Sequence, residues 1–210
     1  PDIFFLSQVF FDSGLAFSDQ ELKELSLACP KETIIVIDGY HGFAALPTDL
    51  SGLEGKVFYL GGGYKYAQAG EGAAFLVVPE GKWRPAYTGW FAEFGTLSRP
   101  TGANVGYTND GMAFMGATQE PSGLYRLNAV WNLFQELNLN VSEIHNYVKD
   151  LQTAFIQGLP DDFLKIHHLR PLFRELEWHG HFLTFEAATE VGAARTQDAL
   201  KEAKGLIDRR

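Results

Sequence analysis

Two stretches decide the fold, Thr33-Ile34-Ile35-Val36-Ile37-Asp38 and Val57-Phe58-Tyr59-Leu60-Gly61-Gly62-Gly63-Tyr64-Lys65. The first is a β-branched apolar run that ends in a carboxylate, as a buried parallel strand does when it delivers an acid to its carboxyl end. The second is an apolar run that ends in glycines, a tyrosine and a lysine. Open α/β sheets bind ligands just beyond the carboxyl ends of neighbouring strands, so Asp38 and Lys65 can face one pocket.

The residues before Asp38 predict a strand, a helix and a second strand. Residues 3–6 are apolar, and Ser18 with Glu21 forms a capping box that begins a helix, which Pro30 ends. The expected apolar stripe of this helix is Leu22, Leu25 and Leu27. Together these elements predict a right-handed βαβ unit with parallel strands.

The apolar run at residues 73–79 predicts a further strand. The loop that joins it to the preceding strand is too short for a helical crossover, so we expect it to be antiparallel to its neighbours. The predicted fold class is α/β, with a mainly parallel sheet and one antiparallel strand, followed by an α+β part.

The pattern changes near residue 122, where we place a domain boundary between 1–121 and 122–210. Residues 80–121 are irregular and rich in glycine, proline and aromatic side chains, which is typical of a functional segment or a cover over a site. Helical spacing follows Ser122, and a second helix is expected from Ser142 to beyond Phe155. A strand at residues 181–185 and a helix over about 189–204 complete the prediction.

Composition limits the function classes. The chain of 210 residues is 46% hydrophobic and can bury a core, yet no apolar run approaches the ~20 residues that cross a bilayer. The start lacks the basic flank of a signal peptide, so we expect a cytoplasmic protein. Its single cysteine, Cys29, permits no internal disulfide and is expected to be a small buried hydrophobe at a helix end. The chain opens inside a strand and stops without a closing element, which indicates a fragment.

The formal net charge of −9 argues against sequence-independent binding to nucleic acid phosphates, because such binding needs a basic face. Small molecules or proteins are the expected partners. The pairs His167-His168 and His179/His181 have no acid or cysteine cluster beside them, so surface or strand-edge histidines are favoured over a metal site.

The groups at the two strand ends suit one cofactor. Lysine becomes a nucleophile when an apolar pocket lowers its pKa, and pyridoxal phosphate needs a lysine for its aldehyde and an acid for its pyridine nitrogen. Lys65 and Asp38, with His41 three residues after Asp38, supply these groups. None of these residues is specific by itself. Lys65 is equally well explained as a surface lysine, Asp38 as an acid that caps a loop and His41 as a loop histidine.

An ordered series of motifs carries a family resemblance. Residues 38–50 followed by Tyr64-Lys65-Tyr66 resemble the class V aminotransferase group of pyridoxal phosphate enzymes, and within it most closely kynureninase. The resemblance extends to residues 6–9, 89–91 and 114–118, and it covers most of residues 1–135. It implies the later part of a fold type I large domain, then most of a small C-terminal domain.

The resemblance also implies roles for individual residues. Lys65 would form the Schiff base and move the Cα proton, and Asp38 would pair with the pyridinium nitrogen. His41 would lie near the phenolic oxygen of the cofactor, and Tyr64 and Trp90 would contact its phosphate. Trp90 is equally well explained as a buried aromatic. Thr118 would reach the phosphate from the partner subunit, which requires a homodimer.

The sequence departs from the family at two places. Gln8 stands where the family commonly has histidine, and residues 10–12 replace a more polar stretch that ends in arginine in kynureninases. The family's phosphate-binding turn, stacking aromatic and substrate-binding arginine are not present in this chain, and Arg209 and Arg210 are expected to be surface residues.

We therefore expect a pyridoxal phosphate enzyme acting on an amino acid, and this piece alone does not have to be active in isolation. Transamination, kynureninase-like C–C hydrolysis and elimination or sulfur removal of the cysteine desulfurase type stay open. Desulfuration is weakened because Cys29 lies at a helix end, whereas that chemistry needs a mobile, exposed thiol. A non-catalytic scaffold of the same fold is the alternative outside enzymes.

Overall fold

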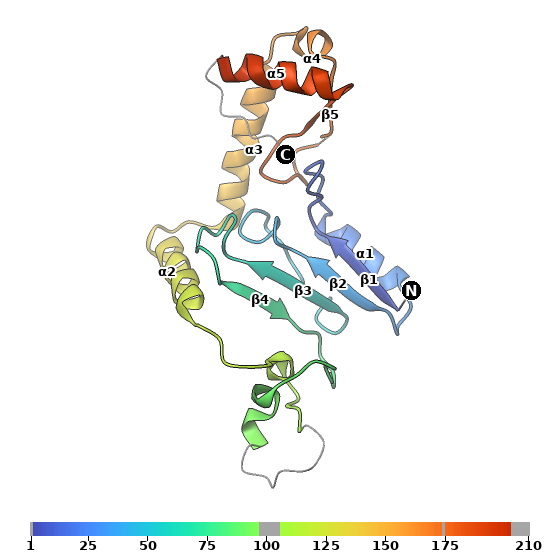
Figure 1. Cartoon of the computed structure of the whole chain (residues 1–210), viewed down its shortest axis with the longest axis vertical. Helices are drawn as coiled ribbons and strands as arrows, with labels where there is room; N and C mark the ends of the chain where they lie inside the picture. Colours follow the sequence, from blue (N-terminus) through green and yellow to red (C-terminus); the bar gives the residue numbers. More distant parts are fainter. Residues whose placement is uncertain (1, 97–105, 174, 203–210) are drawn as a thin grey trace.

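A four-stranded sheet lies at the centre of the chain (Figure 1). The computed structural model describes residues 2–96, 106–173 and 175–202. The strands β1 (Ile3–Ser7), β2 (Ile34–Asp38), β3 (Val57–Gly62) and β4 (Ala74–Val77) are adjacent in that order. β1, β2 and β3 are parallel, and β4 is antiparallel to β3. The predicted fold class is confirmed, including the antiparallel direction of the last strand.

Helix α1 (Asp19–Ala28) covers one face of the sheet, and Ser18 and Glu21 form the predicted capping box. Leu22 is buried there with a group of sheet and loop side chains, namely Ile35, Ile37, Leu53, Val57 and Tyr59. Leu27 is 82% exposed, so its place in the predicted stripe is wrong, and Ser26 is buried instead. A helix advances 100° per residue, so position 26 returns to the face of Leu22 while position 27 has turned well away from it.

The other face of the sheet is largely open. Side chains alternate along a strand, so Ile34, Val36 and Asp38 lie on this face, away from α1. Ile3 and Phe5 of β1 are each about 60% exposed. A hollow of about 430 Å³ is lined by Val36 and Phe58 of the sheet and by side chains of the segment after β4. Asp38 is therefore at the end of an apolar and accessible face.

The two short helices η1 (Trp90–Thr96) and η2 (Gly111–Phe114) lie beyond the amino ends of the parallel strands (Figure 1). Among the described residues of the predicted irregular stretch, these turns are the only regular structure. They are at the opposite end of the sheet from the loops that follow β2 and β3.

The C-terminal part begins with α2 (Ser122–Glu136), which lies beside β4, and α3 (Val141–Gly158), whose capping box is formed by Asn140 and Glu143. It continues with α4 (Phe163–Ile166), the antiparallel pair β5 (Leu169–Pro171) and β6 (Phe185–Ala187), and α5 (Glu190–Glu202). The strand predicted at 181–185 is wrong except at Phe185, because residues 181–184 form a bend and an irregular approach to β6. The boundary at 121/122 coincides with the start of α2 and stays a prediction.

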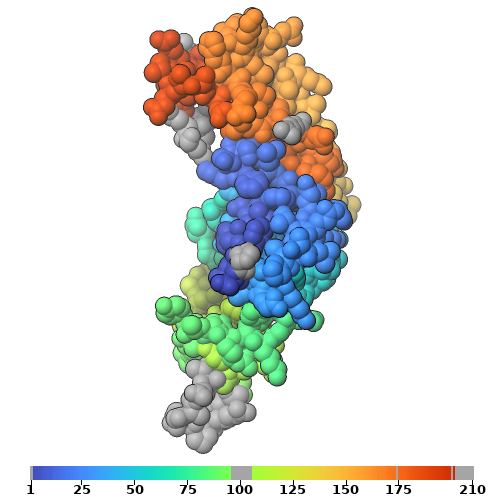
Figure 2. Space-filling view, turned by 90° about the vertical axis from the view of Figure 1, so that its right-hand side faces the viewer, coloured from blue at the N-terminus to red at the C-terminus, as the bar shows by residue number. Residues whose placement is uncertain are grey.

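The molecule is elongated, with the C-terminal helices at one end, the sheet in the middle, and η1 and η2 toward the other end (Figure 2). Among the described residues, no helix is both long enough and apolar enough to cross a membrane. Arg209 and Arg210 lie outside the described residues.

Candidate active site

Asp38 occupies the carboxyl end of β2 and is half-buried. Its Oδ1 accepts a hydrogen bond from the main-chain N–H of Tyr40 at 2.9 Å. The turn 39–42 then closes tightly, with the N–H of Gly42 donating to the carbonyl of Gly39, and it is tied to β3 by Gly39 N–H donating to the carbonyl of Leu60. The carboxylate and the following histidine are therefore presented at the end of the sheet.

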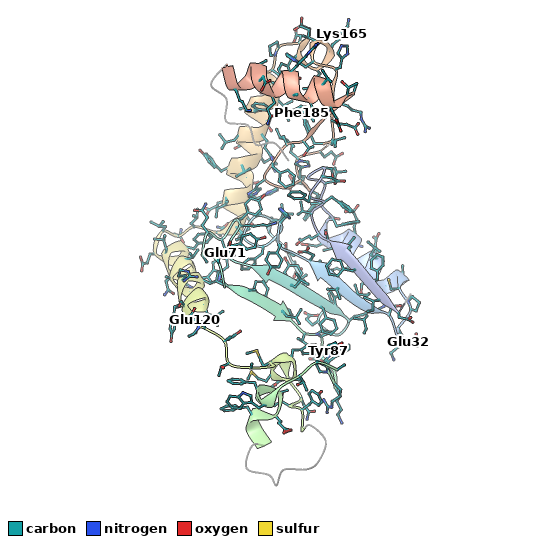
Figure 3. The ribbon with its side chains drawn as sticks, viewed as in Figure 1. Glu32, Glu71, Tyr87, Glu120, Lys165 and Phe185 are labelled. Atoms are coloured by element: carbon teal, nitrogen blue, oxygen red, sulfur yellow. The ribbon has the colours of Figure 1, made fainter. Side chains whose placement is uncertain are left out.

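Lys65 reaches the same place from β3. Its Nζ lies 2.8 Å from Nε2 and 3.2 Å from Nδ1 of His41, and 5.6 Å from the centre of the Tyr64 ring. Glu71, further along the loop that carries Lys65, is labelled beside α2, whereas Tyr87 lies at the other end of the sheet (Figure 3). The structure thus brings together the loops of Asp38 and Lys65, through the contact between His41 and Lys65.

Aromatic side chains surround this contact. Tyr66 belongs to the sequence motif around Lys65, whereas Phe11 and Phe182 were not predicted to lie here. The ring of His41 lies 5.3 Å from Phe11, 6.4 Å from Tyr66 and 5.9 Å from Phe182, measured between ring centres. Phe182 belongs to the C-terminal part of the chain, so both parts contribute to the site. The signal available in the sequence was the aromatic residue on each side of Lys65.

Tyr40 and Tyr64 form one side of the site, with ring centres 5.7 Å apart. Burial, and next the neighbouring Tyr64 and Asp38, raise the pKa of Tyr40. Its phenol therefore stays protonated at neutral pH. Gly62 makes room for this ring, because a Cβ there would lie 2.4 Å from a carbon of Tyr40.

Trp90 and Thr118 are not part of this cluster. Trp90 lies in η1, is half exposed, and packs on Phe91 and Phe94 with ring centres 4.4 and 5.7 Å away. Thr118 is exposed in the connection between η2 and α2. Since η1 lies at the opposite end of the sheet from the loop of Lys65, a single chain does not bring Trp90 to this site (Figure 1).

His168 is exposed as predicted, but another of the histidines expected at the surface is not. His179 is completely buried, and His145, which the sequence reasoning passed over, is only 4% exposed. The His145 ring stacks on His181, with Nδ1 of His145 3.3 Å from Nε2 of His181, and its Nε2 lies 3.0 Å from the carbonyl oxygen of Glu177. The surface assignment is wrong for His179, because it fills the space above Gly14. In the part of the chain that is described, no group of three or more histidine, cysteine, aspartate or glutamate side chains could hold a metal ion.

The burial of His179 and His181 predicts that the folded chain is less stable in acid. Burial, and next the nearby His145, lower the pKa of His181 to about 4, and burial lowers that of His179. Both are neutral in the folded chain, so stability is complete above the unfolded value of about 6.5 and falls as pH drops from there toward 4. Glu177 and Lys149 lie beside His145 and form an ion pair with each other. This ion pair lowers the pKa of Glu177, so protonation of Glu177 breaks the ion pair only at a pH below that at which a glutamate usually titrates.

We expect urea unfolding midpoints to fall between pH 7 and pH 5, and His181→Phe to reduce this fall. His168→Phe is the matched control, because the side chain of His168 is exposed, and this variant should leave the fall unchanged. An unaltered pH dependence in His181→Phe would contradict the assignment.

Comparisons with known proteins support the fold. No protein-family model and no characterised protein sequence matches the chain. A structure described as a complex of the cystine C-S lyase C-DES with its reaction product cysteine persulfide aligns with a TM-score of 0.70 and 20% identity, over 99% of this chain and 53% of that one. A NifS-like protein aligns with a TM-score of 0.65 and 15% identity, over 99% and 49%. An alanine–glyoxylate aminotransferase from Nostoc sp. aligns with a TM-score of 0.56 and 15% identity, over 99% and 54%.

The chain spans about half the length of these solved structures. The likeness confirms the fold that the sequence resemblance implied, which is part of a fold type I architecture. Kynureninase is not among these neighbours, and the closer resemblance to it stays a prediction.

Proposed function

We propose that this chain is part of a pyridoxal phosphate enzyme of the class V aminotransferase type that acts on an amino acid. The observation that carries the proposal is the 2.8 Å contact between Nζ of Lys65 and Nε2 of His41, which unites the loops after β2 and β3. The folds of the lyase and aminotransferase neighbours support it. The proposal goes beyond fold, because it assigns chemistry to named side chains.

The residues present fit the cofactor. The amine of Lys65 meets the imidazole of His41, and the carboxylate of Asp38 lies at the carboxyl end of β2, at the edge of the sheet where α/β sheets bind ligands. When bound, pyridoxal phosphate withdraws electrons from the α carbon of an amino acid. Lys65 would hold its aldehyde and then move the proton at the α carbon, Asp38 would keep the ring nitrogen protonated, and His41 would orient the amine of Lys65. Tyr64 would contact the phosphate.

A homodimer follows from the same proposal. Trp90 of η1 lies at the opposite end of the sheet from the site of its own chain, so a second copy would bring Trp90 and Thr118 to the phosphate. Exposed aromatic side chains in this region support such an interface: Tyr87 is 99% exposed and Phe94 is 51% exposed. Sedimentation of the cofactor-loaded protein as a monomer at micromolar concentration would overturn this part.

The choice among transamination, C–C hydrolysis and C–S cleavage stays open. Cys29 is the C-cap of α1 and precedes the start of β2 by five positions, whereas Asp38 is the last residue of β2; Cys29 therefore lies toward the opposite end of the sheet from Asp38. It cannot act as a nucleophile at Lys65, which argues against desulfuration through this thiol. A carbon–sulfur lyase needs no such thiol, and the likeness to the C-DES structure favours testing cystine as a substrate.

The proposal predicts where pyridoxal phosphate attaches. Full-length protein incubated with the cofactor and reduced with borohydride should carry a pyridoxyl group on Lys65, read by peptide mass mapping. Lys65→Ala should abolish the label, because the amine of Lys65 is the one that lies against His41 at the proposed site. Lys82→Ala, an exposed lysine after β4, is the matched control and should label normally. Attachment to another lysine would overturn the assignment, and reversible binding without attachment would favour the non-catalytic scaffold.

A further inference from the structure

The side chain of Gln8 is completely buried directly after β1. Its Oε1 accepts a hydrogen bond from the hydroxyl of Tyr59 at 3.0 Å, and its Nε2 donates to Oγ1 of Thr48 at 2.7 Å. The amide therefore joins β1, β3 and the loop after β2. A buried polar cluster of this kind costs free energy if any member is left unpaired, so its geometry is tightly defined.

The turn 39–42 rests on these two side chains. A Cβ at Gly42 would lie 2.1 Å from Oε1 of Gln8, and a Cβ at Gly39 would lie 2.0 Å from the ring of Tyr59. Both glycines are thus required by contact with the cluster. The main chain adds a further link, because the N–H of Gln8 donates to the carbonyl of Asp38 at 2.9 Å.

The cluster keeps the same charge across the physiological range. Burial, and to a smaller extent the nearby Asp38, raise the pKa of Tyr59 well above its usual value. The phenol remains protonated and always donates, and an amide does not titrate. The turn that carries His41 is therefore supported by a neutral bond, while the groups above it change protonation during the chemistry.

We propose that Gln8 and Tyr59 are positioning residues, whose buried hydrogen bond holds the turn 39–42 so that His41 meets Lys65. The effect of this positioning on catalysis rests on the proposed function. The contact that it explains, however, can be measured without cofactor. Neither side chain touches the reacting groups, since each acts through the glycines of the turn.

The test uses Tyr59→Phe, which removes one oxygen atom, and Gln8→Leu, which removes both hydrogen bonds of the amide. We expect the ring ¹H–¹⁵N resonances of His41, assigned with His41→Asn, to shift in both variants. Reductive methylation of Lys65, followed by peptide mass mapping, should become about threefold faster or more, because the imidazole of His41 is no longer held in contact with the amine. Gln8→His should retain wild-type behaviour, since an imidazole offers one donor and one acceptor.

Leu53→Ala is the matched control, because Leu53 is buried in the same core but is not part of the turn 39–42 or of the hydrogen bonds of Gln8. It should lower stability and leave the His41 resonances and the Lys65 methylation rate unchanged. If Tyr59→Phe is folded and both readouts equal those of the wild type, the inference is overturned. Failure of the proposed function would instead appear as absence of the pyridoxyl label in the wild type, with the effects on His41 still present.

Discussion

Asp38→Asn is expected to lower exchange of the α-hydrogen of an amino acid by about 10²–10³-fold in the cofactor-loaded protein. The asparagine oxygen can still accept the hydrogen bond from the N–H of Tyr40, so the turn should survive. What disappears is the negative charge that we propose keeps the ring nitrogen protonated. Removing one member of a charge pair that the bound cofactor would bury costs ~3–4 kcal/mol. The loss should appear in the turnover number, measured by deuterium exchange in D₂O.

The matched control is Asp49→Asn, the same change at an exposed carboxylate that pairs with Lys23 at 3.5 Å. It should leave the exchange rate unaltered, because surface ion pairs contribute little. Asp38→Asn should also still attach pyridoxal phosphate to Lys65, since the amine is untouched. A variant that exchanges the α-hydrogen at the wild-type rate would remove Asp38 from the proposed chemistry.

Much of the sheet was predictable because its information is local. The β-branched run before Asp38, the capping box at Ser18 and the short loop before β4 each depend on neighbouring residues alone, and the structure confirms all three. The predicted apolar stripe of α1 is wrong at Leu27, because it included all three leucines without regard to the helical angle between them.

The surroundings of Lys65 were less predictable because they depend on contacts between distant residues. Phe182 reaches His41 from the C-terminal part, and Gln8 meets Tyr59 across 51 positions of sequence. No periodicity or spacing links such pairs. Gln8 was noticed only as a departure from a family pattern, while its full burial and both of its bonds could be seen only in three dimensions.

Gly123→Ala is expected to destabilise the chain by ~2–3 kcal/mol, although alanine is intrinsically the better helix former. Gly123 lies in the first turn of α2, where a Cβ would be 2.4 Å from the carbonyl carbon of Gly72 and 2.7 Å from the nitrogen of Ala73. These are backbone atoms, so the helix must move. One turn later, Arg126 donates to the carbonyls of Ala69, at 2.9 Å, and Glu71. Displacing α2 should therefore also loosen the loop of Lys65 and lower the yield of the pyridoxyl label.

Gly158→Ala separates packing from helix propensity. Gly158 ends α3, and a Cβ there would meet no described heavy atom within 4 Å. Alanine should then be neutral or stabilise by up to ~1 kcal/mol, since only the propensity gain remains. Urea denaturation should give opposite signs for the two variants, with reduced cofactor attachment only in Gly123→Ala. If both variants gained stability, position 123 would have room for a methyl group. The close packing of α2 against Gly72, and with it the effect of α2 on the loop of Lys65, would then be contradicted.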